Sequence, residues 1–232
     1  MNILFAILGL GQGILSFWLL NHLPASWFTE LGEEDSLPAN EVRWRSQPWL
    51  WGSALVLAFS GWLLGGLNDH WFLLMCYALV MQMLWMICLA DGKYQIIPDQ
   101  FTLAIALIGL SLRLVQPTKI LHSVLPAVFF TAGLPWLFAF LWSRLRKVEA
   151  MGMGDFKLLT AFAFLFGWPE ANFVLFISIF SAGFYFMILI LLQKLKLTDH
   201  SPLGPFLSLG AAAWLLFPDF FTSLQTWYVS LF

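Results

Sequence analysis

The sequence predicts an all-α protein, a polytopic membrane bundle of about eight transmembrane helices. Of its 232 residues, 60% are hydrophobic and only 10% are charged, whereas soluble domains carry about 25% charged residues. Its apolar runs approach the roughly 20 residues that a helix needs to cross a bilayer. The 13 tryptophans and 24 phenylalanines are also typical of membrane proteins, because aromatic side chains favour the membrane interface.

Eight apolar runs are the candidate spans. They lie at about 2–20, 50–67, 71–90, 100–116, 121–142, 155–168, 172–192 and 203–217. The sixth is short enough to be re-entrant. The first has neither a basic leader nor a small-residue cleavage site, so we interpret it as a retained helix rather than a signal peptide. We therefore expect a first helix over 1–20, a short cytoplasmic loop or subdomain over 21–49, and a transmembrane domain over 50–232.

The basic residues predict the orientation of these spans. If the loop 21–49 is cytoplasmic, alternation places nine of the 11 basic residues on its side: Arg43, Arg45, Lys93, Arg144, Arg146, Lys147, Lys157, Lys194 and Lys196. Arg113 and Lys119 fall on the other side. Cytoplasmic loops are enriched in Lys and Arg, so both termini are expected outside the cytoplasm. The same loop is acidic, and attraction of a basic peptide and simple solvation both remain open as its role.

Three aspartates lie at span ends on the predicted cytoplasmic side. Asp91 closes the third run, Asp99 follows Pro98, and Asp155 opens the sixth run. Asp99 is placed as a helix N-cap. Asp91 comes at a helix C-terminus, where the helix dipole disfavours a negative charge. An ionisable side chain near the bilayer is costly unless it is paired or faces water, so Asp91 and Asp155 are the stronger candidates for function.

Two glycines precede the third aspartate in GMGDFKLL. Gly152 and Gly154 have no side chains, so we expect another backbone to approach closely there, either a substrate strand or the span that carries Asp91. Two facing carboxylates cannot both ionise cheaply, so one keeps a proton that the other has lost. Such a pair can activate a water molecule and protonate a carbonyl without a metal, which is the chemistry of an aspartic protease.

Two readings from other classes remain open. An ion-coupled transporter also uses intramembrane carboxylates, but here both aspartates are expected at one face rather than at the midplane. A structural membrane subunit would leave the aspartate and glycine pattern without a role.

Metal and nucleic-acid sites have little support in the sequence. The two cysteines, Cys76 and Cys88, form no CxxC pair, and the four histidines are widely spaced, so no metal site is expected. The net charge of −2 gives no reason to expect a nucleic-acid partner.

Three motifs in order resemble the type 4 prepilin peptidases, a branch of the GxGD membrane aspartic proteases. The first is D-x6-P-D, which here is Asp91-GKYQII-Pro98-Asp99. The second is G-x-G-D-x-K-L, here Gly152-Met-Gly154-Asp155-Phe-Lys157-Leu158. The third is P-x-G-P-F, here within Pro202-Leu-Gly204-Pro205-Phe206-Leu207. Together they cover roughly residues 85–215.

The resemblance implies a function and a site. Asp91 and Asp155 would be the catalytic pair, with Gly152, Gly154, Lys157, Pro98 and Asp99 as supporting motif residues. The substrates would be prepilins of type IV pili or pseudopilins of type II secretion, whose basic leaders are cut at the cytoplasmic face of the bacterial inner membrane. Proteolysis would need no cofactor. Many members also methylate the new N-terminus with S-adenosylmethionine, but the N-terminal part departs from the family, without its arginine or zinc cysteines, and leaves that activity open.

Overall fold

The computed structural model describes residues 1–24, 27–28, 47–67, 70–114, 120–147, 151–194 and 202–230. Every regular element in these ranges is a helix, which confirms the predicted all-α class. The chain divides into two compact units. The first contains Met1–His22, Arg43–Met86 and Leu209–Phe232, and the second contains Leu23–Val42 and Ile87–Ser208.

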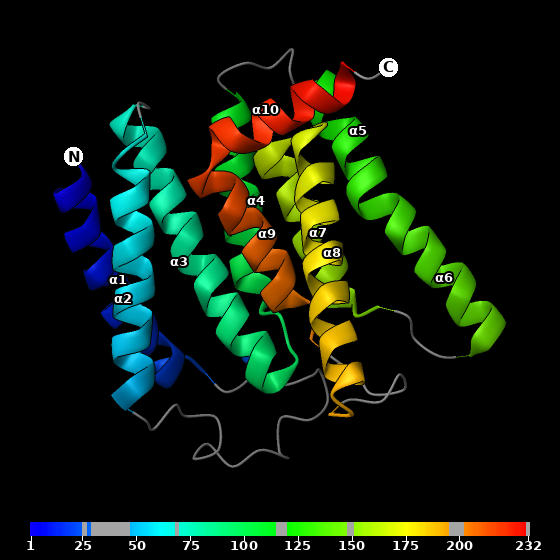
Figure 1. Ribbon diagram of the computed structural model, residues 1–232, viewed down its shortest axis with the longest axis horizontal. Helices are drawn as coiled ribbons and strands as arrows, with labels where there is room; N and C mark the ends of the chain where they lie inside the picture. Colours follow the sequence, from blue (N-terminus) through cyan, green and yellow to red (C-terminus); the bar gives the residue numbers. More distant parts are fainter. Residues whose placement is uncertain are drawn as a thin grey trace. The chain divides into compact units, whose positions relative to one another are not determined.

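In the first unit, α1 (Asn2–His22) and α2 (Gln47–Leu64) lie side by side (Figure 1). Their backbones approach at glycines, because a Cβ at Gly9 or Gly13 of α1 would strike the backbone of α2 at Leu57 or Ala54. Small residues permit such close packing between helices in a membrane. The same unit contains the first part of α3 (Trp71–Tyr94), most of α9 (Gly204–Leu216), and α10 (Pro218–Val229).

In the second unit, α7 (Met153–Phe166) forms the core. Eight of its 14 residues are buried, among them Leu158, Leu159 and Phe162. It packs against α4 (Asp99–Leu114), where Gly109 lies on the backbone of Leu165. The helix α8 (Glu170–Leu191) follows after Gly167.

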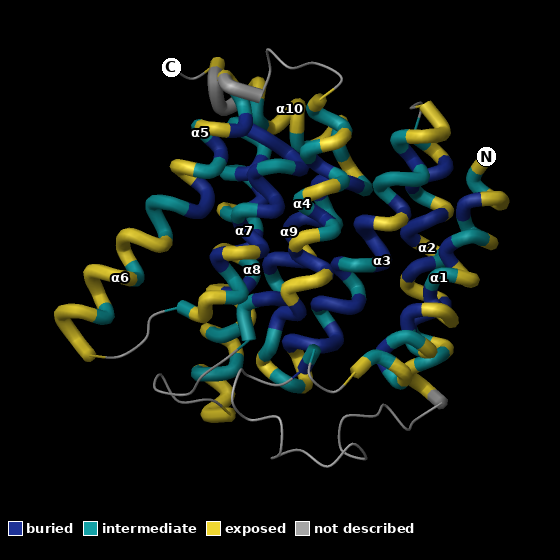
Figure 2. The backbone as a smooth tube through the Cα atoms, turned by 180° about the vertical axis from the view of Figure 1, so that it is seen from behind, coloured by how far each residue is buried: buried dark blue, intermediate teal, exposed yellow. Residues whose placement is uncertain are grey.

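A long, irregular helical stretch completes the second unit. It consists of η2 (Ile120–Val124), α5 (Leu125–Ala127), η3 (Val128–Gly133) and α6 (Leu134–Arg146), of which η2 and η3 are π-helical. Thr131 in η3 donates a hydrogen bond to Asn172 of α8 at 3.0 Å. By contrast α6 has no buried residue, and Figure 2 shows it exposed or half-buried along its length. Its apolar side chains suit contact with lipid.

Arg113 of α4 fixes the C-terminal end of α7. Its guanidinium donates hydrogen bonds to the carbonyl oxygens of Leu165, at 3.3 Å, and Phe166, and to the Ser123 hydroxyl at 3.3 Å. The last carbonyls of a helix lack partners within the helix and form the negative end of its dipole, so a cation is well placed there. This contact holds α4 and α7 together at the end of α7 that is distant from Asp155.

The structure supports a multi-pass membrane protein but does not confirm eight spans. Four of the described helices are long and apolar enough to cross a membrane: Asn2–His22, Trp71–Tyr94, His122–Arg146 and Glu170–Leu191. A fifth results if Gly204–Leu216 and Pro218–Trp227, bent by 93°, count as one span. The 16-residue α4 is only about 24 Å long, and α7 has 14 residues, against a hydrocarbon core of about 30 Å.

The orientation and the division at residues 20 and 49 stay predictions. The acidic side chains of the loop, Glu30, Glu33, Glu34, Asp35 and Glu41, lie outside the described residues.

Candidate active site

Asp91 lies in the last turn of α3 and is buried, with 5% of its surface exposed. Its Oδ2 atom accepts a hydrogen bond from the backbone N–H of Gly204 at 2.8 Å. Gly204 is the first residue of α9, and the first N–H groups of a helix have no acceptor within the helix. The α9 N-terminus therefore supplies the polar partner that the buried carboxyl group of Asp91 needs.

Asp155 lies in the first turn of α7 and is half-buried; α7 has 14 residues and is shorter than the four helices that are long enough to cross a membrane. The turn begins at Gly152, whose backbone is extended and whose carbonyl accepts a hydrogen bond from the Asp155 N–H at 3.2 Å. A Cβ on Gly152 would lie 3.4 Å from the Asp155 Oδ2 atom. The carboxyl group thus folds back over the glycine that starts its helix.

The two carboxyl groups act on one another. Burial, and to a lesser extent the negative charge of Asp91, raise the pKa of Asp155 from its usual 3.8 to about 7, although a hydrogen bond with the Gly152 backbone opposes both effects. Asp155 therefore keeps its proton to a higher pH than an ordinary aspartate does. One protonated and one ionised carboxyl group together can serve as general acid and general base.

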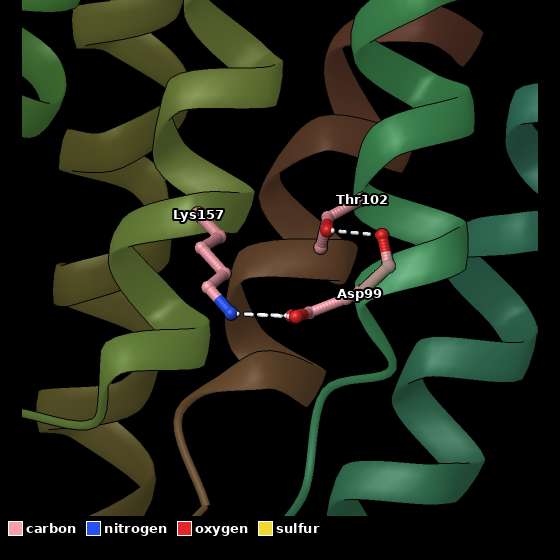
Figure 3. A network of polar contacts seen from close by, with 3 residues as sticks. All are labelled: Asp99, Thr102 and Lys157. Carbon is pink, nitrogen blue, oxygen red and sulfur yellow. Dashed lines mark hydrogen bonds and ion pairs between the residues drawn. The ribbon is translucent and has the colours of Figure 1, made fainter. Parts of the chain in front are cut away.

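Asp99 and Lys157 form an ion pair beside this site (Figure 3). The Lys157 Nζ atom lies 2.8 Å from Oδ1 and 2.6 Å from Oδ2 of Asp99. As predicted, α4 begins at Asp99, and Thr102 donates to its backbone oxygen at 2.8 Å (Figure 3). The carboxylate, however, joins the first turn of α4 to Lys157 of α7, two residues after Asp155.

The sequence predicts that another backbone approaches Gly154, but the structure places a side chain there. A Cβ there would meet the side chain of Ile97, at 3.1 Å from its Cβ atom. Ile97 and Pro98 are both buried in the connection that leads from α3 to α4, and the Pro98 carbonyl accepts the first N–H bonds of α4. The glycine therefore makes room for a side chain from the segment between Asp91 and Asp99.

All seven site residues named from the sequence lie in the second unit. Two contacts were missed: the pairing of Lys157 with Asp99, and the hydrogen bond from Gly204 to Asp91. The motif P-x-G-P-F marked Gly204 but assigned it no role. Within the described ranges, no group of three or more His, Cys, Asp or Glu residues could hold a metal ion.

Comparison with known proteins finds a family match for the segment that carries this site. Residues 78–187, which include both Asp91 and Asp155, match the type IV leader peptidase family. The resemblance predicted from the three motifs is thus confirmed, whereas nothing in the comparisons supports a transporter.

The chain is similar to several proteins named prepilin leader peptidase/N-methyltransferase. It is 35% identical to that of Dichelobacter nodosus over 56% of this chain and 44% of the relative. It is 30% identical to that of Aeromonas hydrophila, over 61% of this chain and 48% of the relative. It is 29% identical to that of Escherichia coli (strain K12), over 60% of this chain and 59% of the relative. The chain thus spans about half the length of these leader peptidase relatives. No solved structure matches it.

Proposed function

We propose that this chain is a membrane aspartic endopeptidase that removes the basic leader peptide from prepilins or pseudopilins. Such substrates assemble into type IV pili or type II secretion pseudopili. The observation that carries the proposal is the pair of Asp91 and Asp155, which come from the ends of two helices in one unit and act on one another electrostatically. The family match and the names of the relatives agree with it.

In the proposed reaction, Asp91 takes a proton from a water molecule, whose oxygen attacks the carbonyl carbon of the scissile peptide bond. Asp155 gives its proton to the carbonyl oxygen, which leaves a neutral diol. The C–N bond then breaks as the leaving nitrogen takes the proton from Asp91, and a diol hydroxyl returns a proton to Asp155. Each aspartate ends in the state in which it started, and the reaction consumes one water molecule.

We place the protein in the bacterial inner membrane, with the active site facing the cytoplasm. The support is the predicted alternation of the spans, which puts nine of the 11 basic residues on the side that carries Asp91, Asp99 and Asp155. The lipid bilayer would cover the exposed apolar side chains of helices such as α6.

The relatives are also named as N-methyltransferases. Methylation of the new N-terminus would use S-adenosylmethionine as its methyl donor, and we assign no residue to that step. The proteolytic step as proposed uses two carboxyl groups and water, without a cofactor.

The test is incubation of the purified chain with a synthetic prepilin, with and without S-adenosylmethionine, followed by mass analysis of the products. The proposal expects a single cut that releases the leader, in both arms. An added mass of one methyl group only in the S-adenosylmethionine arm would establish the second activity. Intact peptide in both arms, with protein that remains folded, would rule out the peptidase.

A further inference from the structure

The start of α9 makes a buried contact with one of the two proposed catalytic groups. The Gly204 N–H donates to Asp91 Oδ2 at 2.8 Å, across 113 positions of sequence, and both residues belong to the second unit. A hydrogen bond to the charged form of a carboxyl group favours that form. The positive end of the α9 dipole acts in the same direction.

A side chain at position 204 would displace the side chain of Asp91. A Cβ there would lie 2.7 Å from Asp91 Oδ2, 2.9 Å from its Cγ and 3.0 Å from its Cβ. Gly204 does not have a positive φ, unlike Gly167, so its backbone conformation does not require glycine. The requirement comes from the Asp91 side chain itself, which occupies the space where a methyl group would be.

We propose that Gly204 is a positioning residue for Asp91. Its N–H holds Oδ2, and its missing side chain lets the carboxyl group lie against the α9 N-terminus. The other carboxylate oxygen, Oδ1, is then the one that takes the proton from water. This inference deepens the proposed peptidase function and rests on it for the catalytic role, whereas the contact between Gly204 and Asp91 can be tested without any activity.

The electrostatic surroundings predict how loss of this contact would change the pH profile. Asp155 of α7 and Cys88 of α3 both interact with the charge of Asp91. Neither is a cation, so the Gly204 N–H is the favourable partner among these groups. Without it the ionised form of Asp91 would be less stable, and the acid limb of the rate profile would move to higher pH.

The first experiment measures cleavage of a synthetic prepilin by Gly204→Ala across pH. We expect kcat about 100-fold lower, the order of loss that a misplacement of about 1 Å produces, together with a shift of the acid limb to higher pH. The matched control is Gly92→Ala, next to Asp91 on α3, where a Cβ would meet nothing within 4 Å. It should cleave at the wild-type rate. A normal rate and an unchanged pH profile in Gly204→Ala, with Asp91→Asn inactive, would overturn the proposal.

The second experiment is a double-mutant cycle on melting temperature in detergent, which needs no cleavage. Gly204→Ala should lower the melting temperature of the wild-type chain, because the new methyl group displaces the Asp91 side chain. In an Asp91→Ala background the Cγ and Oδ2 atoms are gone, so the same substitution should cost much less. An equal loss in both backgrounds would contradict the contact. If the wild type cleaves nothing, the peptidase assignment fails, and this cycle still decides the contact.

Discussion

The contact between α4 and α7 at Gly109 gives a prediction that can be worked from distances. A Cβ at Gly109 would lie 2.5 Å from both the Cα and the N of Leu165 and 2.7 Å from the carbonyl carbon of Phe164. All three atoms belong to the α7 backbone and cannot rotate away. Ordinary contact begins at 3.4 Å, so Gly109→Ala forces the two helices apart by about 0.9 Å, the difference between 3.4 and 2.5 Å.

Two effects of opposite sign follow from this substitution. Overpacking of a well-packed interface costs about 1–3 kcal/mol, and a rigid backbone neighbour favours the upper part of that range. Alanine stabilises a helix interior by about 1 kcal/mol relative to glycine. We therefore expect a net loss of about 1–2 kcal/mol in the free energy of unfolding. Because α7 carries Asp155, its displacement should also slow prepilin cleavage by at least tenfold.

The assay is thermal denaturation of the purified protein in detergent, followed by helical circular dichroism, with cleavage measured in parallel. Gly183→Ala in α8 is the control, since a Cβ there meets nothing within 4 Å, and its melting temperature should equal or exceed that of the wild type. A Gly109→Ala protein that melts as high as this control, with normal cleavage, would refute the close packing of α4 on α7.

Three further predictions concern the neighbourhood of Asp155. Asp99→Asn should lower the free energy of unfolding by less than about 1 kcal/mol, because the paired side chains of Asp99 and Lys157 are 62% and 47% exposed and exposed ion pairs contribute little. A melting temperature many degrees lower would contradict this. Cleavage should fall as pH rises through about 7, since the raised pKa of Asp155 means that it holds its proton below that pH and loses it above; a rate that stays flat to pH 9 would be evidence against Asp155 as the acid. Gly154→Ala should reduce cleavage several-fold, because its Cβ would lie 3.1 Å from that of Ile97, and full activity would mean that this contact yields without moving Asp155.

The sequence was sufficient for the fold class, whereas the catalytic pairing of Asp91 and Asp155 stays a prediction. Composition alone indicated a helical membrane protein, and the placement of Asp91 and Asp155 at span ends singled them out. It was not sufficient for their partners, because the bonds from Lys157 to Asp99 and from Gly204 to Asp91 join positions 58 and 113 residues apart. Such pairs depend on how helices pack, and no local periodicity encodes them.

The count of eight spans stays unconfirmed for a related reason. The apolar runs 100–116, 155–168 and 203–217 correspond to helices of 16, 14 and 13 residues. Hydropathy measures only whether a segment avoids water. A short helix buried against its neighbours, as α7 is, looks the same in a hydropathy window as one that crosses the bilayer.

The most direct test of the account is the cleavage of a synthetic prepilin by Asp91→Asn and by Asp155→Asn, each compared with wild type at equal amounts of membrane-inserted protein. An amide can neither take the proton from water nor hold the proton that the carbonyl oxygen needs. The account predicts that each variant accumulates in the membrane and yields no released leader. Release of the leader by either variant at the wild-type rate would contradict the pairing of these two aspartates in catalysis.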